Sequence, residues 1–230
     1  LYLGRQGSRQ GEGLSKNTVN DRCRKARQMF ANAVEHRLIE RNPFAALKGL
    51  TVRANPDRFV YVSAADTLRV IHVAGDADFQ LVIALCRFAG LRNPSETLNL
   101  RWENVDLPAG RMTVDSPKTE HHDGKAYRVV PIFPEIRPYL EQARQQAPRE
   151  AEYVVEAWRS QEKNMRTRML RAIRRAGLKA WTKPFQNLRS SCQTDLEERF
   201  PSHVVCAWLG NSQRVATEHY LQVTEEHFSR

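Results

Sequence analysis

The chain has 230 residues, enough for one or two hydrophobic cores, and its 41% hydrophobic and 27% charged residues are ordinary for a globular protein. Its charge is unusual, because 36 lysines and arginines against 26 acidic residues leave a net charge of +10. Such a charge favours polyanionic partners. An acidic membrane surface is the weaker option among them, because no basic amphipathic helix stands apart from the fold. The longest strongly apolar stretch, residues 79 to 91, is interrupted by Arg87 and is too short to span a bilayer.

No signal peptide is visible near the N-terminus, so we expect a cytoplasmic protein. The first residue is leucine rather than methionine, and we expect the chain to be a fragment that lacks its true N-terminus. The four cysteines show no Cys-x-x-Cys spacing, and Cys86 and Cys206 lie in apolar helical runs. We therefore expect reduced core cysteines and neither a disulfide framework nor a metal site.

The first part of the chain is predicted to hold a tail, one helix and a linker. Residues 1 to 13 contain four glycines and few apolar residues, which indicates a flexible tail. Apolar residues then recur at helical spacing, with Ser15 or Asn17 as the cap and Asn42-Pro43 as the end of the helix. Residues 49 to 59 show no helical periodicity and are predicted to link two domains.

Positive charge is concentrated in two parts of the chain. The first 60 residues hold 12 basic and 5 acidic side chains, a net of +7, whereas the remainder carries 24 against 21, a net of +3. Within that remainder, residues 163 to 189 carry nine lysines or arginines and no acidic residue. Because no acids interleave to form i,i+4 pairs, we interpret this run as a surface that follows phosphates rather than as a solvated helix face.

From Ser63 onward the sequence predicts a mainly α-helical fold with a small three-stranded antiparallel sheet, an α+β arrangement. Ser63 and Asp66 resemble a capping box, and residues 78 to 88 are predicted to form a buried helix. Asn93-Pro94 is predicted to start another helix, with Glu96 closing its capping box. The period then changes to two, which predicts strands at residues 102–107, 111–114 and 127–132, followed by helices at residues 134–147, 160–176, 188–198, 202–209 and 212–220.

Several short motifs follow one another in a fixed order through this second body. They are Ala89-Gly90-Leu91-Arg92-x-x-Ser95-Glu96 with Trp102-x-x-Val105-Asp106, Lys118-Thr119 before Arg128-Val129-Val130-Pro131-Ile132, Gln186-Asn187-Leu188-Arg189, and Leu209-Gly210-Asn211-Ser212 through Tyr220. Together they resemble the catalytic domain of the tyrosine recombinases, the phage integrase family, over most of residues 60 to 226. Residues 14 to 48 are similar to the last helix of that family's core-binding domain.

The resemblance implies three parts: a C-terminal fragment of a helical core-binding (DNA-clamp) domain at residues 1–48, a linker at 49–59 and a catalytic domain at 60–230. It also implies a site-specific recombinase or integrase that cuts and rejoins DNA strands through a 3′-phosphotyrosine intermediate, without metal, cofactor or ATP. The implied partner is double-stranded DNA, on which four copies assemble as a homo-tetramer, and no small-molecule substrate is expected.

By this resemblance Arg92 and Arg189 hold the scissile phosphate, because a planar guanidinium matches two phosphate oxygens and stays charged. Lys118 is the expected general acid for the departing 5′ oxygen, with Lys125 as a competing candidate in the same hairpin. Tyr220 is the expected nucleophile, although an ordinary tyrosine pKa of about 10 leaves little phenolate at neutral pH. Taken singly, each has a commoner structural explanation, which the order and spacing of the set outweigh.

The chain departs from the family pattern at two positions where a histidine is usual, occupied here by Gln186 and Asn211. Both amides can donate a hydrogen bond to a phosphate oxygen, but neither can accept a proton as a general base. The sequence is therefore consistent with a slow enzyme and with an inactive one. His219 is not expected to substitute, because adjacent helical residues point about 100° apart; a water can take the proton instead.

Other notable side chains have structural explanations. Glu96 is expected to close a capping box and, by the resemblance, to support Arg92. His121 and His122 are expected to be solvated turn residues, because no cysteine or acidic triad accompanies them. The four tryptophans are expected to pack in the core or at an interface: Trp102, Trp158, Trp181 and Trp208.

The main alternative to a recombinase is a catalytically degenerate DNA-binding module of the same fold, which the two missing histidines and the basic run would satisfy. A type IB topoisomerase would use the same chemistry, but the helix and linker before residue 60 favour the recombinase arrangement. A basic helical RNA-binding protein is a weaker alternative, because the sequence has no RNA-type aromatic motif.

Overall fold

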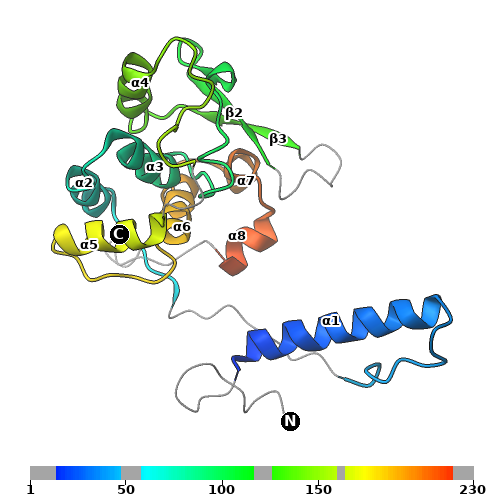
Figure 1. Cartoon of the computed structure of the whole chain (residues 1–230). Helices are drawn as coiled ribbons and strands as arrows, with labels where there is room; N and C mark the ends of the chain where they lie inside the picture. The colour runs from blue at the N-terminus through cyan, green and yellow to red at the C-terminus, as the bar shows by residue number, and fades with distance from the viewer. Residues whose placement is uncertain (1–13, 48–57, 117–125, 160–163, 220–230) are drawn as a thin grey trace. The chain divides into compact units, whose positions relative to one another are not determined.

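The structure, a computed structural model, describes residues 14–47, 58–116, 126–159 and 164–219 (Figure 1). The chain divides into two compact units, Leu1–Ala54 and Asn55–Arg230. In the first unit, helix α1 (Lys16–Glu35) begins where the Ser15 hydroxyl accepts a hydrogen bond from the backbone N–H of Thr18 at 3.3 Å. Ser15 rather than Asn17 is therefore the cap.

Helix α1 ends at Glu35, well before the predicted end at Asn42-Pro43. Arg37 takes a left-handed conformation with φ of 57°, through which a right-handed helix cannot continue. Asn42 instead folds the next segment back onto the helix, because its side-chain amide donates to the carbonyl of Arg27 at 2.8 Å. The helix is thus confirmed and its predicted end is wrong.

The core of the second unit is built around α3 (Ala77–Phe88) and α6 (Pro184–Glu197), which pack against each other. Residues 81–88 of α3 are all buried, as a central helix requires, and this confirms the predicted buried helix. The one charged member, Arg87, pairs with Asp195 of α6 at 2.5 Å. Helix α2 (Ala64–His72) packs against α3 and is capped by Ser63, as predicted.

The sheet contains β1 (Val105–Asp106), β2 (Arg111–Asp115) and β3 (Tyr127–Pro131), in the order β1-β2-β3 with both pairs antiparallel. The predicted α+β class with three antiparallel strands is confirmed. The first strand is shorter than predicted, because Trp102–Asn104 forms a short 3-10 helix, η3. In β3, Arg128 and Val130 are buried while Tyr127 and Val129 are exposed. An arginine therefore occupies a core-facing position of the sheet.

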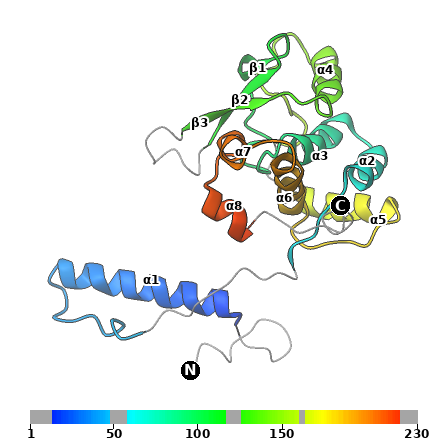
Figure 2. The same cartoon turned by 180° about the vertical axis from the view of Figure 1, so that it is seen from behind.

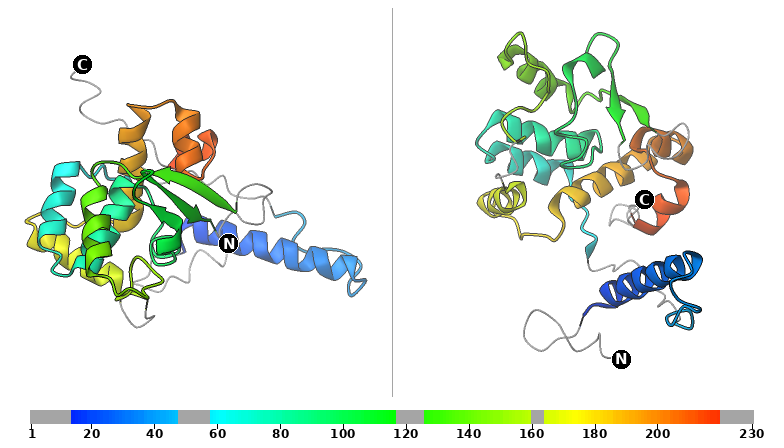
Figure 3. Two further views of the ribbon diagram at one scale, coloured as in Figure 1. Left: turned by 90° about the horizontal axis from the view of Figure 1, so that it is seen from above. Right: turned by 45° about the vertical axis from the view of Figure 1, so that its right-hand side comes forward.

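The remaining helices are α4 (Arg137–Gln146), α5 (Met165–Arg175), α7 (Ser202–Leu209) and α8 (Gln213–His219). α4 packs against α3, while α5 and α7 pack against α6. Seen from behind, β3 lies next to α7, and β1 and β2 lie nearer α4 (Figure 2). Helix α6 runs between α5 at its start and α7 at its end (Figure 3). One long helix thus connects the basic helix α5 to the turn after α7.

The predicted helix at Asn93-Pro94 is wrong, because residues 93–99 form consecutive turns. The Glu96 carboxylate accepts a hydrogen bond from the backbone N–H of Arg92 at 2.8 Å, one residue earlier than a cap at Asn93 would require. Two arginine side chains also bind this carboxylate, and they draw Glu96 into the interior. The tryptophans pack as predicted, with Trp158 buried and the other three partly buried against the core.

None of the helices within the described ranges is long and apolar enough to cross a membrane. The four cysteines are unpaired thiols, and Cys86, Cys192 and Cys206 are buried. Burial raises the pKa of the Cys192 thiol to about 12, so this side chain stays protonated and unreactive at neutral pH. In the part of the chain that the structure describes, no cluster of three or more His, Cys, Asp or Glu side chains is placed to hold a metal ion.

Candidate active site

Two arginines that are distant in the sequence meet on the same short segment, Leu209-Gly210, at the end of α7. Arg92, which follows α3, donates from Nη2 to the carbonyl of Gly210 at 3.0 Å. Arg189, in α6, donates from Nη2 to the carbonyl of Leu209 at 2.6 Å. Two consecutive carbonyls thus accept hydrogen bonds from the two guanidinium groups, and the structure brings Arg92 and Arg189, the arginines predicted to bind phosphate, together.

A second contact ties the two arginine-bearing segments to each other. Arg189 also donates from Nη1 to the carbonyl of Gly90, just before Arg92. Gly90 and Gly210 are both left-handed, with φ of 64° and 67°, a conformation that favours glycine. A Cβ on Gly210 would lie only 2.9 Å from Cδ of Arg128. Glycine at residue 210 is therefore required both by the backbone and by the packing of an arginine.

The carboxylate of Glu96 lies at the centre of this cluster and is 2% exposed. It pairs with Arg92 at 2.5 Å and with Arg128 at 2.7 Å, and Nη1 of Arg189 lies 3.8 Å from it. Three guanidinium charges surround one carboxylate, so the cluster has a net positive charge, the sign that attracts a phosphate. We call these four residues the Glu96 cluster.

Glu96 remains charged despite its position. Burial opposes its ionisation, but the hydrogen bonds and charge of Arg128, together with the charges of Arg189 and Arg92, outweigh burial. The pKa of Glu96 is consequently lowered from its ordinary value, and the carboxylate can hold the arginines in place at neutral pH.

The three arginines of the Glu96 cluster differ in their access to solvent. The side chain of Arg92 is 17% exposed, against 3% for Arg189 and 6% for Arg128. Of the three, Arg92 is therefore the most accessible to a ligand that approaches the cluster from solvent.

Asn211, directly after the Leu209-Gly210 segment, is fixed by a chain of amides. Its Nδ2 donates to Oε1 of Gln193 at 2.9 Å, and Gln193 donates to Glu197 at 3.3 Å. Because a carboxylate only accepts, Glu197 sets the orientation of Gln193 and hence of Asn211. Oδ1 of Asn211 is buried and has no hydrogen-bond partner among the described residues. The second N–H of Asn211 is a donor that a phosphate oxygen can use.

The sequence of residues 61–227 matches that of the Phage integrase family, which covers most of the second unit. The chain belongs to the phage integrase family. No curated protein sequence matches it.

Solved integrase and recombinase structures share the fold. The chain resembles XerA recombinase with a TM-score of 0.60 and 19% identity, over 93% of this chain and 78% of that one. It resembles lambda integrase in a dimer bound to a COC' core site with a TM-score of 0.67 and 16% identity, over 91% and 77%. For the Tn1549 transposon integrase in complex with transposon right end DNA, the TM-score is 0.69 at 18% identity, over 94% and 78%.

Two of the residues predicted to act in this integrase, Lys118 and Tyr220, lie outside the described residues, as does Lys125. The described residues nearest in the sequence to Lys118 and Tyr220 are Ser116 and His219. Ser116, the last described residue before Lys118, accepts a hydrogen bond from Nη1 of Arg128 at 2.7 Å. Helix α8 ends at His219, immediately before Tyr220. Gln186 is exposed near the start of α6, apart from the buried members of the cluster.

Arg128 is the member of this site that sequence reasoning missed. Its Nε donates to the carbonyl of Trp208 at 2.7 Å, and its two terminal nitrogens bind Glu96 and Ser116. One side chain of β3 thus joins Ser116, the residue after β2, to the turns after α3 and to the end of α7. The signal was present in the strand alternation, because an arginine at a core-facing position needs a buried acid as its partner.

Proposed function

We propose that this integrase cuts and rejoins strands of double-stranded DNA through a covalent bond to Tyr220. The observation that carries the proposal is the meeting of Arg92 and Arg189 at Leu209-Gly210, with Glu96 behind them. Two guanidinium groups held at one point match the oxygens of a single phosphate. Removing one such donor from an active site typically slows a reaction by about 10²–10³-fold.

In the proposed first step, the phenol oxygen of Tyr220 attacks the phosphorus and the bond to the 5′ oxygen breaks. Lys118 donates a proton to that oxygen, so the products are a 3′-phosphotyrosine and a free 5′ hydroxyl. A 5′ hydroxyl from a partner strand then attacks the phosphotyrosine and releases the phenol. One phosphoester replaces another in each step, and ATP is therefore not required.

At the two positions where the family usually has a histidine, this chain has the neutral amides Gln186 and Asn211, which cannot receive the proton of the Tyr220 phenol. We propose that a water takes this proton and that the enzyme is slow, since general acid–base help is typically worth about 10²–10⁴-fold. Asn211 would contribute one hydrogen bond to the phosphate instead.

The second candidate function is a DNA-binding module without catalysis. It is favoured by the same two amides, and by the commitment of one Asn211 N–H to Gln193. The two functions differ in one product, the covalent protein–DNA adduct.

The proposed function also has consequences for the binding partners, the assembly and the domains of the chain. The lambda integrase and Tn1549 structures contain DNA, and one lambda integrase structure is a tetramer bound to a Holliday junction. On this support we propose duplex DNA as the substrate, a homo-tetramer as the working assembly and the cytoplasm as its place. Residues 1–48 would be the end of a core-binding domain, 49–59 the linker and 60–230 the catalytic domain.

The deciding experiment measures that adduct on DNA that the chain is known to bind. Duplexes selected from a random pool by binding are rebuilt with a nick near each phosphate in turn, so that a cleaved strand end diffuses away. We expect a covalent adduct on denaturing gels that disappears in Tyr220→Phe while affinity is retained. Tyr127→Phe, at a tyrosine 63% exposed on β3, is the matched control and should keep the adduct. Tight binding without any adduct would establish the module instead.

The general acid can be assigned on the same DNA once the cleaved phosphate is mapped. Replacing the bridging 5′ oxygen by sulfur gives a leaving group that departs without a proton, because a thiol has a far lower pKa than an alcohol. We expect Lys118→Ala to be slow on the oxygen duplex and restored on the sulfur duplex, with Lys125→Ala unaffected. The reverse pattern would assign the role to Lys125.

A further inference from the structure

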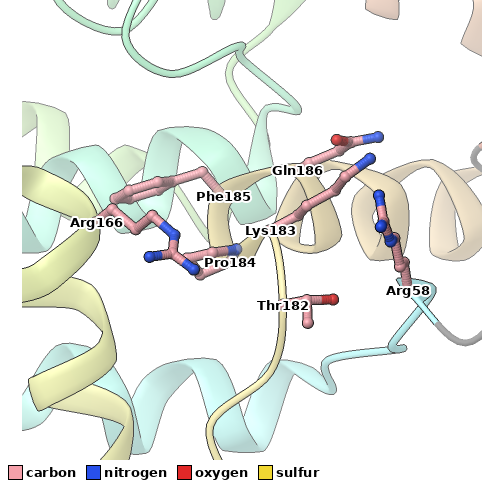
Figure 4. A pocket seen from close by; sticks show the side chains of 7 residues that line it. All are labelled: Arg58, Arg166, Thr182, Lys183, Pro184, Phe185 and Gln186. Atoms are coloured by element: carbon pink, nitrogen blue, oxygen red, sulfur yellow. The ribbon is translucent and has the colours of Figure 1, made fainter. Parts of the chain in front are cut away.

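A pocket of about 410 Å³ opens at the start of α6, and cations from three separate segments line it. They are Arg58 before α2, Arg166 in α5 and Lys183 directly before α6, and Gln186 lies with them. Figure 4 shows the polar ends of Arg58, Lys183 and Gln186 extending to the same side of α6. Among the described residues, no acidic side chain lines the pocket.

The charges of this pocket are not neutralised within the described residues, where no ion pair includes Arg58, Arg166 or Lys183. The neighbouring arginine on α5 behaves differently, because Arg168 pairs with Asp76. Three exposed cations line one cavity and repel one another, and an anionic ligand reduces that repulsion.

The pocket is held in shape by Asn187, which is 2% exposed. Its Nδ2 donates to the carbonyl of Arg58 at 3.1 Å and to the carbonyl of Thr182 at 2.7 Å, and its Oδ1 accepts from the backbone N–H of Val60 at 3.2 Å. The backbone on both sides of the pocket is therefore fixed to the first turn of α6. Fixing the backbone that carries two of the cations, Arg58 and Lys183, lowers the conformational entropy that they lose when a ligand binds.

Lys183 has a left-handed backbone, with φ of 45° and ψ of 57°, which L side chains rarely adopt. Residues strained in this way concentrate at binding sites, where surrounding contacts hold them. Here the bond from Asn187 to the carbonyl of Thr182 holds the residue before Lys183. The conformation places an ammonium group at the rim of the pocket.

The pocket and the Glu96 cluster both include residues of α6. Gln186 and Arg189 are one helical turn apart, about 4.5 Å along the axis. Successive phosphates of one DNA strand follow each other at about 3.4 Å along the duplex axis. A strand whose phosphate lies at the Glu96 cluster can therefore bring a second phosphate to the pocket.

We propose that this pocket binds a second backbone phosphate of duplex DNA, close to the one held by Arg92 and Arg189. Arg58, Arg166 and Lys183 supply the charge, and Gln186 donates a hydrogen bond to the same phosphate. The proposal rests on the proposed function, since it names a further contact of the same DNA. It gives Gln186 a role outside the proton transfers.

The test is the salt dependence of binding, measured by fluorescence anisotropy with the full chain and a random-sequence duplex. Each phosphate contact contributes about 0.9 to the slope of log K against log salt concentration. We expect Arg58→Ala, Arg166→Ala and Lys183→Ala each to lower the slope by part of this amount, and the triple variant by up to about 0.9, because the pocket holds a single phosphate.

Arg149→Ala is the matched control, because it removes one exposed arginine beyond α4 that has no ion pair among the described residues. A triple variant whose slope equals that of Arg149→Ala would overturn the proposal. Thermal midpoints of all variants are compared first. If the alanine set melts early, the set Arg58→Gln, Arg166→Gln and Lys183→Gln provides the same comparison.

Two further measurements distinguish failure of the pocket proposal from failure of the proposed strand transfer. Inorganic phosphate is the second probe: pocket-dependent phosphate binding with an unchanged DNA slope would assign a free-anion site and overturn the backbone contact. The covalent-adduct assay is the third: an adduct with an unchanged slope overturns the pocket alone. A lowered slope without any adduct supports the pocket and overturns the proposed strand transfer.

Discussion

Glu96 and Asn187 are both 2% exposed, and each organises one end of the DNA-facing surface proposed here, but they do so in opposite ways. Glu96 is charged and binds three arginine side chains directly. The side chain of Asn187 is neutral and binds backbone groups around the pocket, so it does not offset the charge of the nearby cations. A buried acid thus holds cations through direct ion pairs that are part of the fold. A buried amide holds only the backbone that carries the cations, and their charge remains available to an anionic ligand.

The largest effect should come from Glu96→Gln, which removes the only acid among three clustered arginines. Breaking a buried ion pair by removing one partner typically costs about 3–5 kcal/mol. We expect a loss of that size in the free energy of unfolding, measured with urea. Glu141→Gln removes an exposed partner of Arg137 and should change it by less than about 1 kcal/mol. Equal losses in the two variants would show that the Glu96 cluster does not hold the fold.

The same carboxyl predicts how stability depends on pH. The pKa of Glu96 is lowered in the folded state, so its contribution is complete above its ordinary pKa of 4.5 and is lost as the pH falls through the lower folded value. The free energy of unfolding should fall by up to about 1.4 kcal/mol per pH unit in this acid range because of Glu96. The difference between the unmodified chain and Glu96→Gln should therefore narrow below pH 4.5. A constant difference down to acid pH would contradict the lowered pKa.

Asn187→Ala tests the neutral organiser. It leaves the carbonyls of Arg58 and Thr182 and the N–H of Val60 without the bonds they have now. An unsatisfied buried polar group costs about 1–3 kcal/mol, and we expect a loss in that range by urea unfolding. We also expect a lower salt slope of DNA binding, because the backbone at Arg58 and next to Lys183 is no longer held in place by Asn187. If Asn187→Ala lowers the free energy of unfolding but leaves the salt slope unchanged, Asn187 stabilises the fold without contributing to DNA binding.

Gly210→Ala tests how closely the Leu209-Gly210 segment fits the arginines. The new Cβ meets Arg128 at 2.9 Å, and the left-handed backbone disfavours alanine. We expect a loss of about 1–2 kcal/mol in the free energy of unfolding. Gly177→Ala is the matched control, because it has a similar φ of 72° but its Cβ would meet only the end of an arginine side chain at 3.5 Å. The excess loss at residue 210 measures the packing against Arg128.

The smallest effect, and one of opposite sign, is expected from Lys183→Gly. Glycine adopts the left-handed conformation without strain, so stability should rise by about 1 kcal/mol in thermal unfolding. DNA affinity should fall, because one cation of the pocket is lost. A stability gain without any loss of affinity would mean that Lys183 does not contact the DNA.

The elements of the fold that rest on local patterns were predictable. The apolar run of α3, the cap at Ser63 and the alternation of the strands each have one explanation in local chemistry. The failures arose where a distant partner decided the structure. Residues 93–99 form turns because Glu96 is bound by Arg128 of a later strand, and α1 ends early where Asn42 binds back to Arg27. Neither partner lies within reach of a local pattern.

The site was predictable in composition and less so in arrangement. The motifs identified Arg92 and Arg189, and the structure brings them together. They included Arg128 but gave it no role, and they did not reveal the pocket that contains Gln186, because both depend on chain segments that meet only after folding. Lys118 and Tyr220, outside the described residues, stay predictions.

The bonds from Arg92 and Arg189 to the Leu209-Gly210 carbonyls have a practical consequence for genetics. Removing either side chain takes away hydrogen bonds that stabilise the native protein as well as any catalytic role of the arginine. Loss of activity alone therefore does not show which of the two was lost. Only replacements that are shown to keep the melting temperature can be interpreted as chemistry. Screens that score recombination in cells would confuse misfolded chains with faulty enzymes at both positions.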